Sequence, residues 1–388
     1  MLRQRRLLAA PLLTLALAGC GGGNETTAPD GGTPDGGSEV DAGMVDPSTF
    51  GVTDTGPFTC GHRVLEITYN PPAGQPARTI PVHVWYPSTS TDGEHSRYKG
   101  IFLDPNAWED GALAPAAWKA GYPVLVHSHG HMGFAGNSYR LMCHFAMHGW
   151  LTVAPEHVGN TLTDTPDPRP LALYYERPLD MRAALGLIEK LPAEDPLAGK
   201  ADFGHLGVSG HSFGTYTAWA QGGSTFDVDA IKAACAKGDP GSCDDAGYAV
   251  FGTDLSEKRA KAIIPMAGGQ HEFFGTSGLD ATKVPALLMT GSLDQVGADM
   301  LFANISGVDF TWADVEGGCH QLYGLGNSVK GDAACTALDD EEGFGIVNPY
   351  ILAFARYHVL GERGEEVKGL VEGTKGISPK MHVQHKGP

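Results

Sequence analysis

The sequence contains few basic residues for its length. Of its 388 residues, 27 are Lys or Arg and 45 are Asp or Glu, so the formal net charge is −18. This shortage of positive charge argues against binding to nucleic acids and against electrostatic docking on anionic membranes. The sequence also lacks an internal repeat. Its length therefore fits a single large α/β domain with terminal extensions.

The apolar run near the amino terminus is too short to cross a bilayer. It covers Leu7–Leu17 and follows three arginines among the first six residues. This pattern predicts a signal peptide over residues 1–19 rather than a structural element. Leu17-Ala18-Gly19-Cys20 resembles the lipobox of bacterial lipoproteins, which implies cleavage before Cys20 and lipid attachment to its sulfur. An ordinary secretory signal with a chance cysteine is the alternative.

Residues 21–48 are nearly free of large apolar side chains and are rich in Gly, Pro, Asp and Thr. They predict a flexible linker between Cys20 and a folded domain over residues 49–370, which a polar tail over 371–388 follows. In such lipoproteins an Asp after the cysteine implies retention in the inner membrane, but Gly21 stands here. We therefore expect an exported chain anchored to the bacterial cell envelope, at the outer membrane or the surface.

Cysteine is scarce, with seven residues in the chain. Setting Cys20 aside leaves six, and an even number in an exported chain favours disulfides. Six cysteines allow 15 connectivities, but two pairs are close in sequence. The pairing that this proximity favours is Cys60–Cys143, Cys235–Cys243 and Cys319–Cys335.

Short apolar segments alternate with segments of helical periodicity along most of the chain. We expect strands at 63–69, 79–86, 122–127, 150–154, 205–209, 262–267, 285–290 and 308–315, and helices at 138–148, 174–191, 215–220 and 344–359. Residues 88–121 look like a loop with a short helix. The alternation predicts an α/β fold with a mostly parallel central sheet and helices on both faces.

Residues 222–258 interrupt this alternation with many Gly, Asp and Ala residues. They contain the Cys235–Cys243 pair and follow the segment at 215–220. We interpret them as an insertion, either a small cap over the active-site face or a disulfide-pinned surface excursion without a catalytic role.

The five residues Gly210-His211-Ser212-Phe213-Gly214 have the form of a nucleophile elbow. An apolar segment precedes them and a possible helix follows, which is the context that G-x-S-x-G requires. The flanking glycines remove Cβ atoms that would clash, so the chain can turn sharply and expose the hydroxyl of Ser212. A plain strand-to-helix turn is the alternative interpretation.

A serine hydroxyl is a poor nucleophile unless a base removes its proton. In α/β-hydrolases an acid and then a histidine follow the serine, each after a later strand. Asp294 stands four residues past the apolar segment that ends at Thr290, and His320 follows a strand and two glycines. We therefore predict Asp294 as the acid and His320 as the base. A helix N-cap and a surface-loop histidine are the respective alternatives.

The chain has 16 histidines, so other candidates exist. None of them has the position of His320 after the last strand. The rival bases are His205, His211, His271 and His358, and the rival acids are Asp180, Asp314 and Glu316. Asp180 precedes the elbow, Asp314 falls within a strand, and Glu316 is too near His320 in sequence.

A tetrahedral intermediate needs two backbone donors for its oxyanion. We expect them at Phe213, directly after the nucleophile, and at His131, where Gly130 lets the chain turn after the 122–127 strand. The residues His127, His129 and His131 alternate, which could also indicate zinc because alternate residues of a strand share a face. The oxyanion loop already explains this segment, so we expect neither a metal nor a cofactor.

Taken in order, these segments resemble the platelet-activating factor acetylhydrolase branch of the α/β-hydrolases and related dienelactone-hydrolase-like esterases. The matching segments are Pro-Val-His-Val-Trp-Tyr-Pro at 81–87, Ser-His-Gly at 128–130, Ala-Pro-Glu-His at 154–157, Arg-Pro-Leu-Asp-Met-Arg at 177–182 and the elbow. The resemblance covers about residues 60–325, with the insertion unmatched. It implies a nucleophile at Ser212, an acid at Asp294, a base at His320 and oxyanion donors at Phe213 and His131.

Members of that family hydrolyse short or oxidised acyl esters of phospholipids without calcium. Two departures matter here: the first oxyanion residue is usually apolar in the family, and dienelactone hydrolases use a cysteine nucleophile. We therefore expect a serine carboxylic ester hydrolase acting on short-acyl lipid or phospholipid esters. A secreted general esterase, polyesterase or lipase is the alternative. A peptidase on the same fold and a non-catalytic binding lipoprotein are the two remaining hypotheses.

Overall fold

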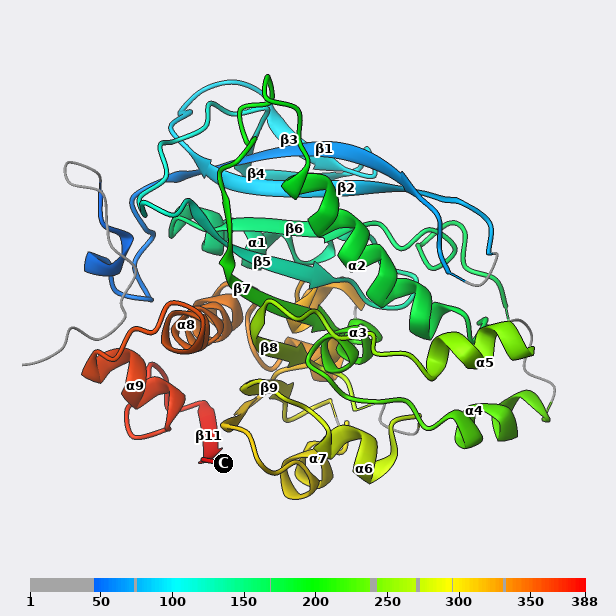
Figure 1. Ribbon diagram of the computed structural model, residues 1–388. Helices are drawn as coiled ribbons and strands as arrows, with labels where there is room; N and C mark the ends of the chain where they lie inside the picture. The colour runs from blue at the N-terminus through cyan, green and yellow to red at the C-terminus, as the bar shows by residue number, and fades with distance from the viewer. Residues whose placement is uncertain are drawn as a thin grey trace, which may run out of the picture. The chain divides into compact units, whose positions relative to one another are not determined.

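The computed structural model describes residues 45–388 except 73–74, 168, 238–242, 270–272, 295 and 331–332. The predicted signal peptide, Cys20 and most of the predicted linker therefore lie outside the described residues. The strands form an 11-stranded sheet in the order β11-β10-β9-β8-β7-β5-β6-β2-β1-β4-β3 (Figure 1). Their bounds are β1 Thr59–Tyr69, β2 Arg78–Ser88, β3 His95–Tyr98, β4 Phe102–Glu109, β5 Tyr122–Ser128, β6 Leu151–Pro155, β7 Ala201–His211, β8 Ala260–Met266, β9 Ala286–Gly291, β10 Phe310–Val315 and β11 Met381–Lys386.

The middle of the sheet is parallel from β6 through β5, β7, β8 and β9 to β10. The chain passes from β5 to β6 on one side and then returns to β7 on the other side of β5. The order of the strands therefore reverses between β5 and β7, and in open α/β sheets this switch point is where ligands bind, beyond the carboxyl ends of the strands. Antiparallel strands β2 and β11 flank this parallel block.

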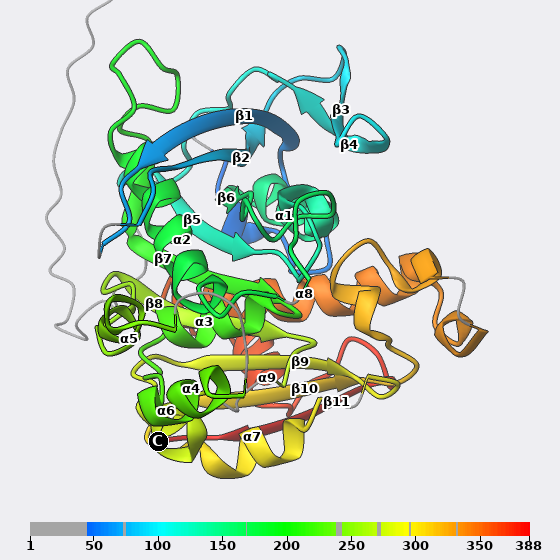
Figure 2. The same ribbon diagram turned by 90° about the vertical axis from the view of Figure 1, so that its right-hand side faces the viewer.

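Helices cover both faces of the sheet (Figures 1 and 2). Their bounds are α1 Tyr139–Met147, α2 Leu173–Glu189, α3 Gly214–Gln221, α4 Val228–Cys235, α5 Asp245–Phe251, α6 Gly275–Asp280, α7 Ala298–Asn304, α8 Asp340–His358 and α9 Glu365–Val371. Short 3-10 turns occur at Pro47–Thr49, Ala135–Ser138, His320–Tyr323, Asn327–Lys330 and Ala333–Thr336.

The two faces hold separate hydrophobic cores. Alternate strand residues point to opposite faces, so Ile264 packs in the core with α1 and α8 while Ile263 packs in the core with α2 and α3. Both residues are fully buried. Because the parallel strands are covered on both sides, they appear in the sequence as continuous apolar runs.

Two sequence predictions about strands were wrong. Residues 88–121 contain β3 and β4 rather than a loop with a short helix, and β4 pairs with the distant strand β1. Residues 381–386, predicted as part of a polar tail, form the edge strand β11 along β10. In both places most side chains are partly or fully exposed, so the apolar pattern that marks a buried strand is missing.

The described residues of the insertion at 222–258 lie at the end of the sheet away from the carboxyl ends of the strands (Figure 2). The insertion leaves the sheet after α3 and returns where the amide of Glu257 donates to the carbonyl of Gln221 at 3.0 Å. Because α3 runs back from the elbow, this point lies toward the amino ends of β7 and β8. Figure 2 shows α4 and α5 at this end of the sheet, away from the start of α8.

The six cysteines of the domain stand in pairs at disulfide distance, as sequence proximity favoured. These pairs are Cys60–Cys143, Cys235–Cys243 and Cys319–Cys335. In the part of the chain that the structure describes, no helix combines the length and the apolar character needed to cross a membrane.

Candidate active site

The predicted elbow is a sharp turn between β7 and α3. Ser212 has a φ of 56°, a left-handed conformation that costs energy for a residue with a side chain. Its amide donates to the carbonyl of Met266 on β8 at 2.9 Å, which holds the turn against the sheet. A Cβ atom on Gly210 or Gly214 would overlap a backbone carbonyl oxygen, that of Gly214 or of Ser128 respectively. The sequence G-x-S-x-G is therefore required by the backbone packing here.

The structure brings Ser212, His320 and Asp294 together in one hydrogen-bonded chain. Nε2 of His320 lies 2.7 Å from Oγ of Ser212, and Nδ1 of His320 lies 2.8 Å from Oδ2 of Asp294. The side chain of His320 is 33% exposed and that of Asp294 is 16% exposed. The imidazole of His320 is thus partly open to solvent, while the carboxylate of Asp294 is largely covered.

Two glycines allow the loops of the acid and the base to meet. A Cβ atom on Gly291, at the end of β9, would overlap the carbonyl of Gly318, which precedes His320 by two residues. The amide of Leu293 donates to that same carbonyl at 3.0 Å. Gly318, before His320, thus serves close backbone packing.

Two further groups hold the backbone around His320. Nε2 of His211, within the elbow, donates to the carbonyl oxygen of His320 at 2.8 Å. Burial lowers the pKa of His211 to about 3, so this imidazole is neutral at physiological pH. Cys319 is tied to Cys335 by a disulfide. His211 therefore orients the loop of the base, in keeping with its rejection as the base itself.

The loop after β5 lies directly against the nucleophile. A Cβ atom on Gly130 would meet Cβ of Ser212 at 3.1 Å, so Gly130 lets this loop approach the serine. His131 follows, and its ring lies 6.0 Å from the ring of Phe213 in an edge-on arrangement. The two residues predicted to donate to an oxyanion are therefore neighbours beside Ser212. Their donor role remains a prediction.

The alternating histidines at the end of β5 and in this loop bind three different protein groups. Nδ1 of His127 lies 2.9 Å from Oγ of Ser209, Nε2 of His129 accepts from the amide of His157 at 3.1 Å, and Nδ1 of His131 lies 2.7 Å from Nδ2 of Asn160. No group of three or more His, Cys, Asp or Glu side chains among the described residues is arranged to hold a metal ion.

A second chain of polar side chains lies buried behind the elbow. Oδ2 of Asp180 lies 2.9 Å from Nδ1 of His157, and Nε2 of His157 lies 2.9 Å from Oγ of Ser128. The rival acid Asp180 thus has a histidine partner, but the ring of this histidine binds Ser128 rather than Ser212. Burial lowers the pKa of His157 well below its ordinary value, so its ring is neutral.

Sequence reasoning missed the part that Arg177 and His157 play in this buried chain. Arg177 is 1% exposed and binds Ser128, His129 and Asn160. The available signal was the resemblance itself, because the matching segments Ser-His-Gly, Glu-His and Arg-Pro-Leu-Asp supply most of these side chains. The sequence did not reveal that these segments meet.

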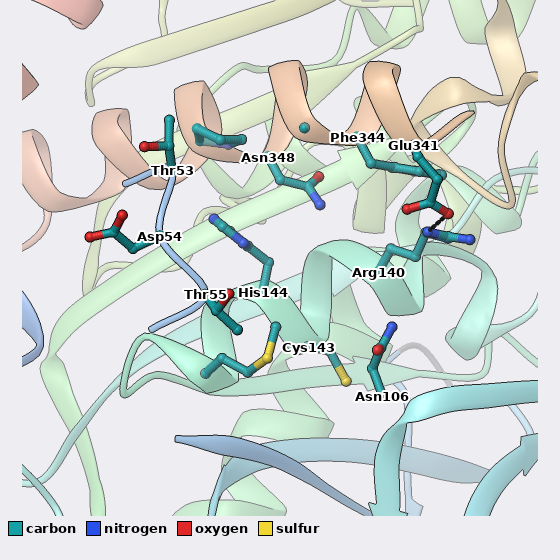
Figure 3. A pocket seen from close by; sticks show the side chains of 13 residues that line it. Thr53, Asp54, Thr55, Asn106, Arg140, Cys143, His144, Glu341, Phe344 and Asn348 are labelled. Carbon is teal, nitrogen blue, oxygen red and sulfur yellow. Dashed lines mark hydrogen bonds and ion pairs between the residues drawn. The ribbon is translucent and has the colours of Figure 1, made fainter. Parts of the chain in front are cut away.

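A cavity of about 260 Å³ lies elsewhere, between α1, α8 and the segment before β1 (Figure 3). Figure 3 shows Arg140 and Glu341 joined across its wall, with His144 and Asn348 also lining it. Ser212, Asp294 and His320 are not among its lining residues. It offers no serine beside a base, so it does not match the chemistry of the elbow.

Comparison with known proteins gives a likeness of fold. Neither a protein-family model nor a curated protein sequence matches the chain. Among solved structures, the chain is similar to a ferulic acid esterase from Streptomyces cinnamoneus, with a TM-score of 0.55 and 16% sequence identity over 84% of this chain and 96% of that one. The chain therefore shares the fold of that esterase, and its sheet, its helices on both faces and its elbow are consistent with the α/β-hydrolase fold.

Proposed function

We propose that the protein is a serine carboxylic ester hydrolase that works without a cofactor. The observation that carries this proposal is the chain from Asp294 through His320 to Ser212, with hydrogen-bond distances of 2.8 and 2.7 Å. A strained serine next to a half-exposed histidine and a covered carboxylate is the arrangement that activates a hydroxyl for acyl transfer. The shared fold of an esterase supports the same conclusion.

The reaction follows from this geometry. Oγ of Ser212 attacks the ester carbonyl carbon while its proton passes to Nε2 of His320. Asp294 accepts the hydrogen bond from Nδ1 and stabilises the imidazolium. The amides of Phe213 and His131 donate to the oxyanion. The leaving alcohol takes the proton from His320 and an acyl-enzyme remains. A water molecule gives a proton to His320 and attacks the acyl carbon, and His320 then returns that proton to Oγ of Ser212 as the acid leaves.

For the substrate, we propose a short-acyl lipid or phospholipid ester, as the resemblance to platelet-activating factor acetylhydrolases implies. We further propose that Cys20 carries a lipid that holds the enzyme at the bacterial envelope. A general esterase is the second candidate, which the shared fold with a ferulic acid esterase favours. Both candidates use the same three side chains and differ in the acyl and alcohol groups that they accept.

Hydrolysis of p-nitrophenyl esters from acetyl to dodecanoyl tests the proposal. The full chain in a mild detergent is compared with Ser212→Ala. We expect turnover of the shortest esters by the wild type and a loss of roughly 10³–10⁶-fold in the variant. Activity that rises toward dodecanoyl would instead indicate a lipase, and activity that survives Ser212→Ala would exclude the proposed nucleophile.

A further inference from the structure

Arg177 on α2 is a fully buried cation that contacts three separate segments. Its Nη1 donates to Oδ1 of Asn160 at 2.8 Å, and its Nη2 donates to Oγ of Ser128 at 3.1 Å and to the carbonyl oxygen of His129. Its Cζ lies 4.7 Å from the centre of the Phe213 ring. A single planar guanidinium therefore joins the elbow, the loop after β5 and the loop after β6.

These three segments carry both proposed oxyanion donors. Phe213 supplies one amide from the elbow. Ser128 and His129 immediately precede the turn that presents the amide of His131. The side-chain amide nitrogen of Asn160 donates to Nδ1 of His131 at 2.7 Å, and its amide oxygen accepts from Arg177. The position of each donor is thus fixed through one or two contacts to the same guanidinium.

The hydrogen bonds around Arg177 form a chain in which each group donates to the next one. Arg177 donates to Ser128, the hydroxyl of Ser128 donates to Nε2 of His157, and Nδ1 of His157 donates to Asp180. Tyr69 and Arg78 also donate to Asp180. A neutral histidine and a hydroxyl thus connect the buried cation to a buried carboxylate. A buried guanidinium held in this way has little freedom to move.

We infer that Arg177 is the positioning residue of the oxyanion site. Its planar guanidinium is held in one orientation and keeps the amides of Phe213 and His131 at the separation that the tetrahedral intermediate needs. The inference rests on the proposed ester hydrolysis and assigns this role to a side chain that does not touch substrate. Donors that are held in place before the reaction stabilise the oxyanion without a cost for reorganisation.

The test replaces Arg177 with Lys, which keeps the charge, and with Met, which removes it. Lys has one donor group in place of the planar fork, so neither variant can bridge the three segments. We expect kcat to fall roughly 10²–10³-fold in both variants, with KM changed by less than about threefold. Affinity for a trifluoromethyl ketone, which mimics the tetrahedral intermediate, should fall by the same factor as kcat/KM.

Arg356→Lys is the matched control. Arg356 is also a buried arginine, 5% exposed, and it binds Glu362 and the carbonyls of Phe50 and Ser48 far from the elbow in sequence. We expect this variant to lose thermal stability and to keep its kcat. A parallel loss of kcat in both variants would show general loosening of the fold and would overturn the inference.

Ser128→Ala is the second variant, in case substitution of Arg177 prevents folding. It removes one contact of the guanidinium, and we expect kcat to fall roughly 3–10-fold at unchanged KM. Normal kcat in folded Arg177→Lys together with a loss in Arg177→Met would show that charge and not position matters, and would also overturn the inference. Failure of the proposed function appears separately, as activity that survives Ser212→Ala.

Discussion

Two serine–histidine–aspartate chains lie on neighbouring strands of this protein. The first joins Ser212, His320 and Asp294 through distances of 2.7 and 2.8 Å. The second joins Ser128, His157 and Asp180 through two distances of 2.9 Å. Ser128 at the end of β5 pairs in register with Gly210, the first residue of the elbow. The same three side-chain types are therefore connected in nearly the same way, and the two serines lie at the ends of neighbouring strands.

The surroundings of the two chains differ. His157 and Asp180 are fully buried, whereas the side chain of His320 is 33% exposed. The hydroxyl of Ser128 already accepts from Arg177, and Ser128 belongs to a regular strand. Ser212 has the strained backbone of the elbow.

The comparison teaches that connectivity alone does not make a nucleophile. A substrate must reach the serine, the serine must have no other partner that fixes its hydroxyl, and donors must face the developing oxyanion. The chain at Ser212 meets the first two conditions and, by our proposal, the third. The chain at Ser128 meets neither of the first two, and we assign it a structural task. Breaking a link of the first chain should therefore lower mainly turnover, whereas breaking a link of the second should lower mainly stability, with a smaller loss of turnover through Arg177.

Removing the histidine of each chain should separate the two tasks most strongly. His320→Ala removes the base, so we expect turnover to fall roughly 10³–10⁶-fold with little change in melting temperature. His157→Ala removes the ring that joins Asp180 to Ser128, so each of them loses one buried hydrogen bond. It should lower the free energy of unfolding by about 2–5 kcal/mol. Ester turnover and thermal melting of both variants check this pair, and similar losses of turnover in two stable proteins would contradict it.

Replacing the aspartates should repeat this contrast. Asp294→Asn keeps the shape of the side chain but favours the wrong tautomer of His320, so we expect kcat to fall roughly 10⁴-fold. Asp180→Asn removes the fully buried carboxylate beside Arg78, which then pairs with Glu176 alone, and should cost about 3–5 kcal/mol of stability. Urea unfolding and kcat are measured on both. A stable Asp180→Asn with wild-type kcat would remove the structural task from the second chain.

The two chains touch at Gly214, which offers a further test. A methyl group at this position would overlap the carbonyl of Ser128, so Gly214→Ala should cost about 1–3 kcal/mol of stability and lower turnover. Gly186→Ala is the control, because no atom lies within 4 Å of its added Cβ. In the last turn of α2 it should stabilise the protein by up to about 1 kcal/mol. Equal effects of the two substitutions would contradict the close packing proposed here.

A further expected effect is a dependence of stability on pH. His127 is fully buried, and burial lowers its pKa to about 3, whereas an unfolded chain has a histidine pKa of about 6.5. Between these values the unfolded chain binds a proton that the folded protein does not. Stability contributed by neutral His127 is therefore complete above pH 6.5 and is lost as the pH falls.

The matched variant for this effect is His127→Gln. Between pH 7 and pH 5 the wild type should lose about 2 kcal/mol more of its unfolding free energy than the variant does. Urea unfolding at the two pH values measures this difference. An identical loss in both proteins would mean that His127 titrates normally in the folded state.

Local patterns in the sequence predicted much of the parallel sheet and the three residues of the first chain. Strands such as β5 and β9 are buried on both faces, so their apolar runs stand out. The strands β4 and β11 alternate irregularly and are largely exposed, and the strands β1 and β10 that they join are distant in sequence, so local pattern did not reveal them. The motif G-x-S-x-G fixes its own backbone locally, which explains why the elbow was found.

The second chain could not be derived in this way. Asp180 was a rival acid only because of its residue type, and its partner His157 stands 23 residues away. Which of 16 histidines meets which carboxylate depends on the packing of α2 against the loops after β5 and β6. Such contacts come from tertiary structure and leave no spacing that a single sequence displays.

Labelling with a fluorophosphonate probe tests the central contrast most directly. The native full chain is treated with the probe, digested and mapped by mass spectrometry, beside His320→Ala. We predict one equivalent of label on Ser212, none on Ser128, and loss of the label in His320→Ala. Absence of label from Ser212, or label on Ser212 that persists without His320, would contradict the account of Ser212 as the activated nucleophile.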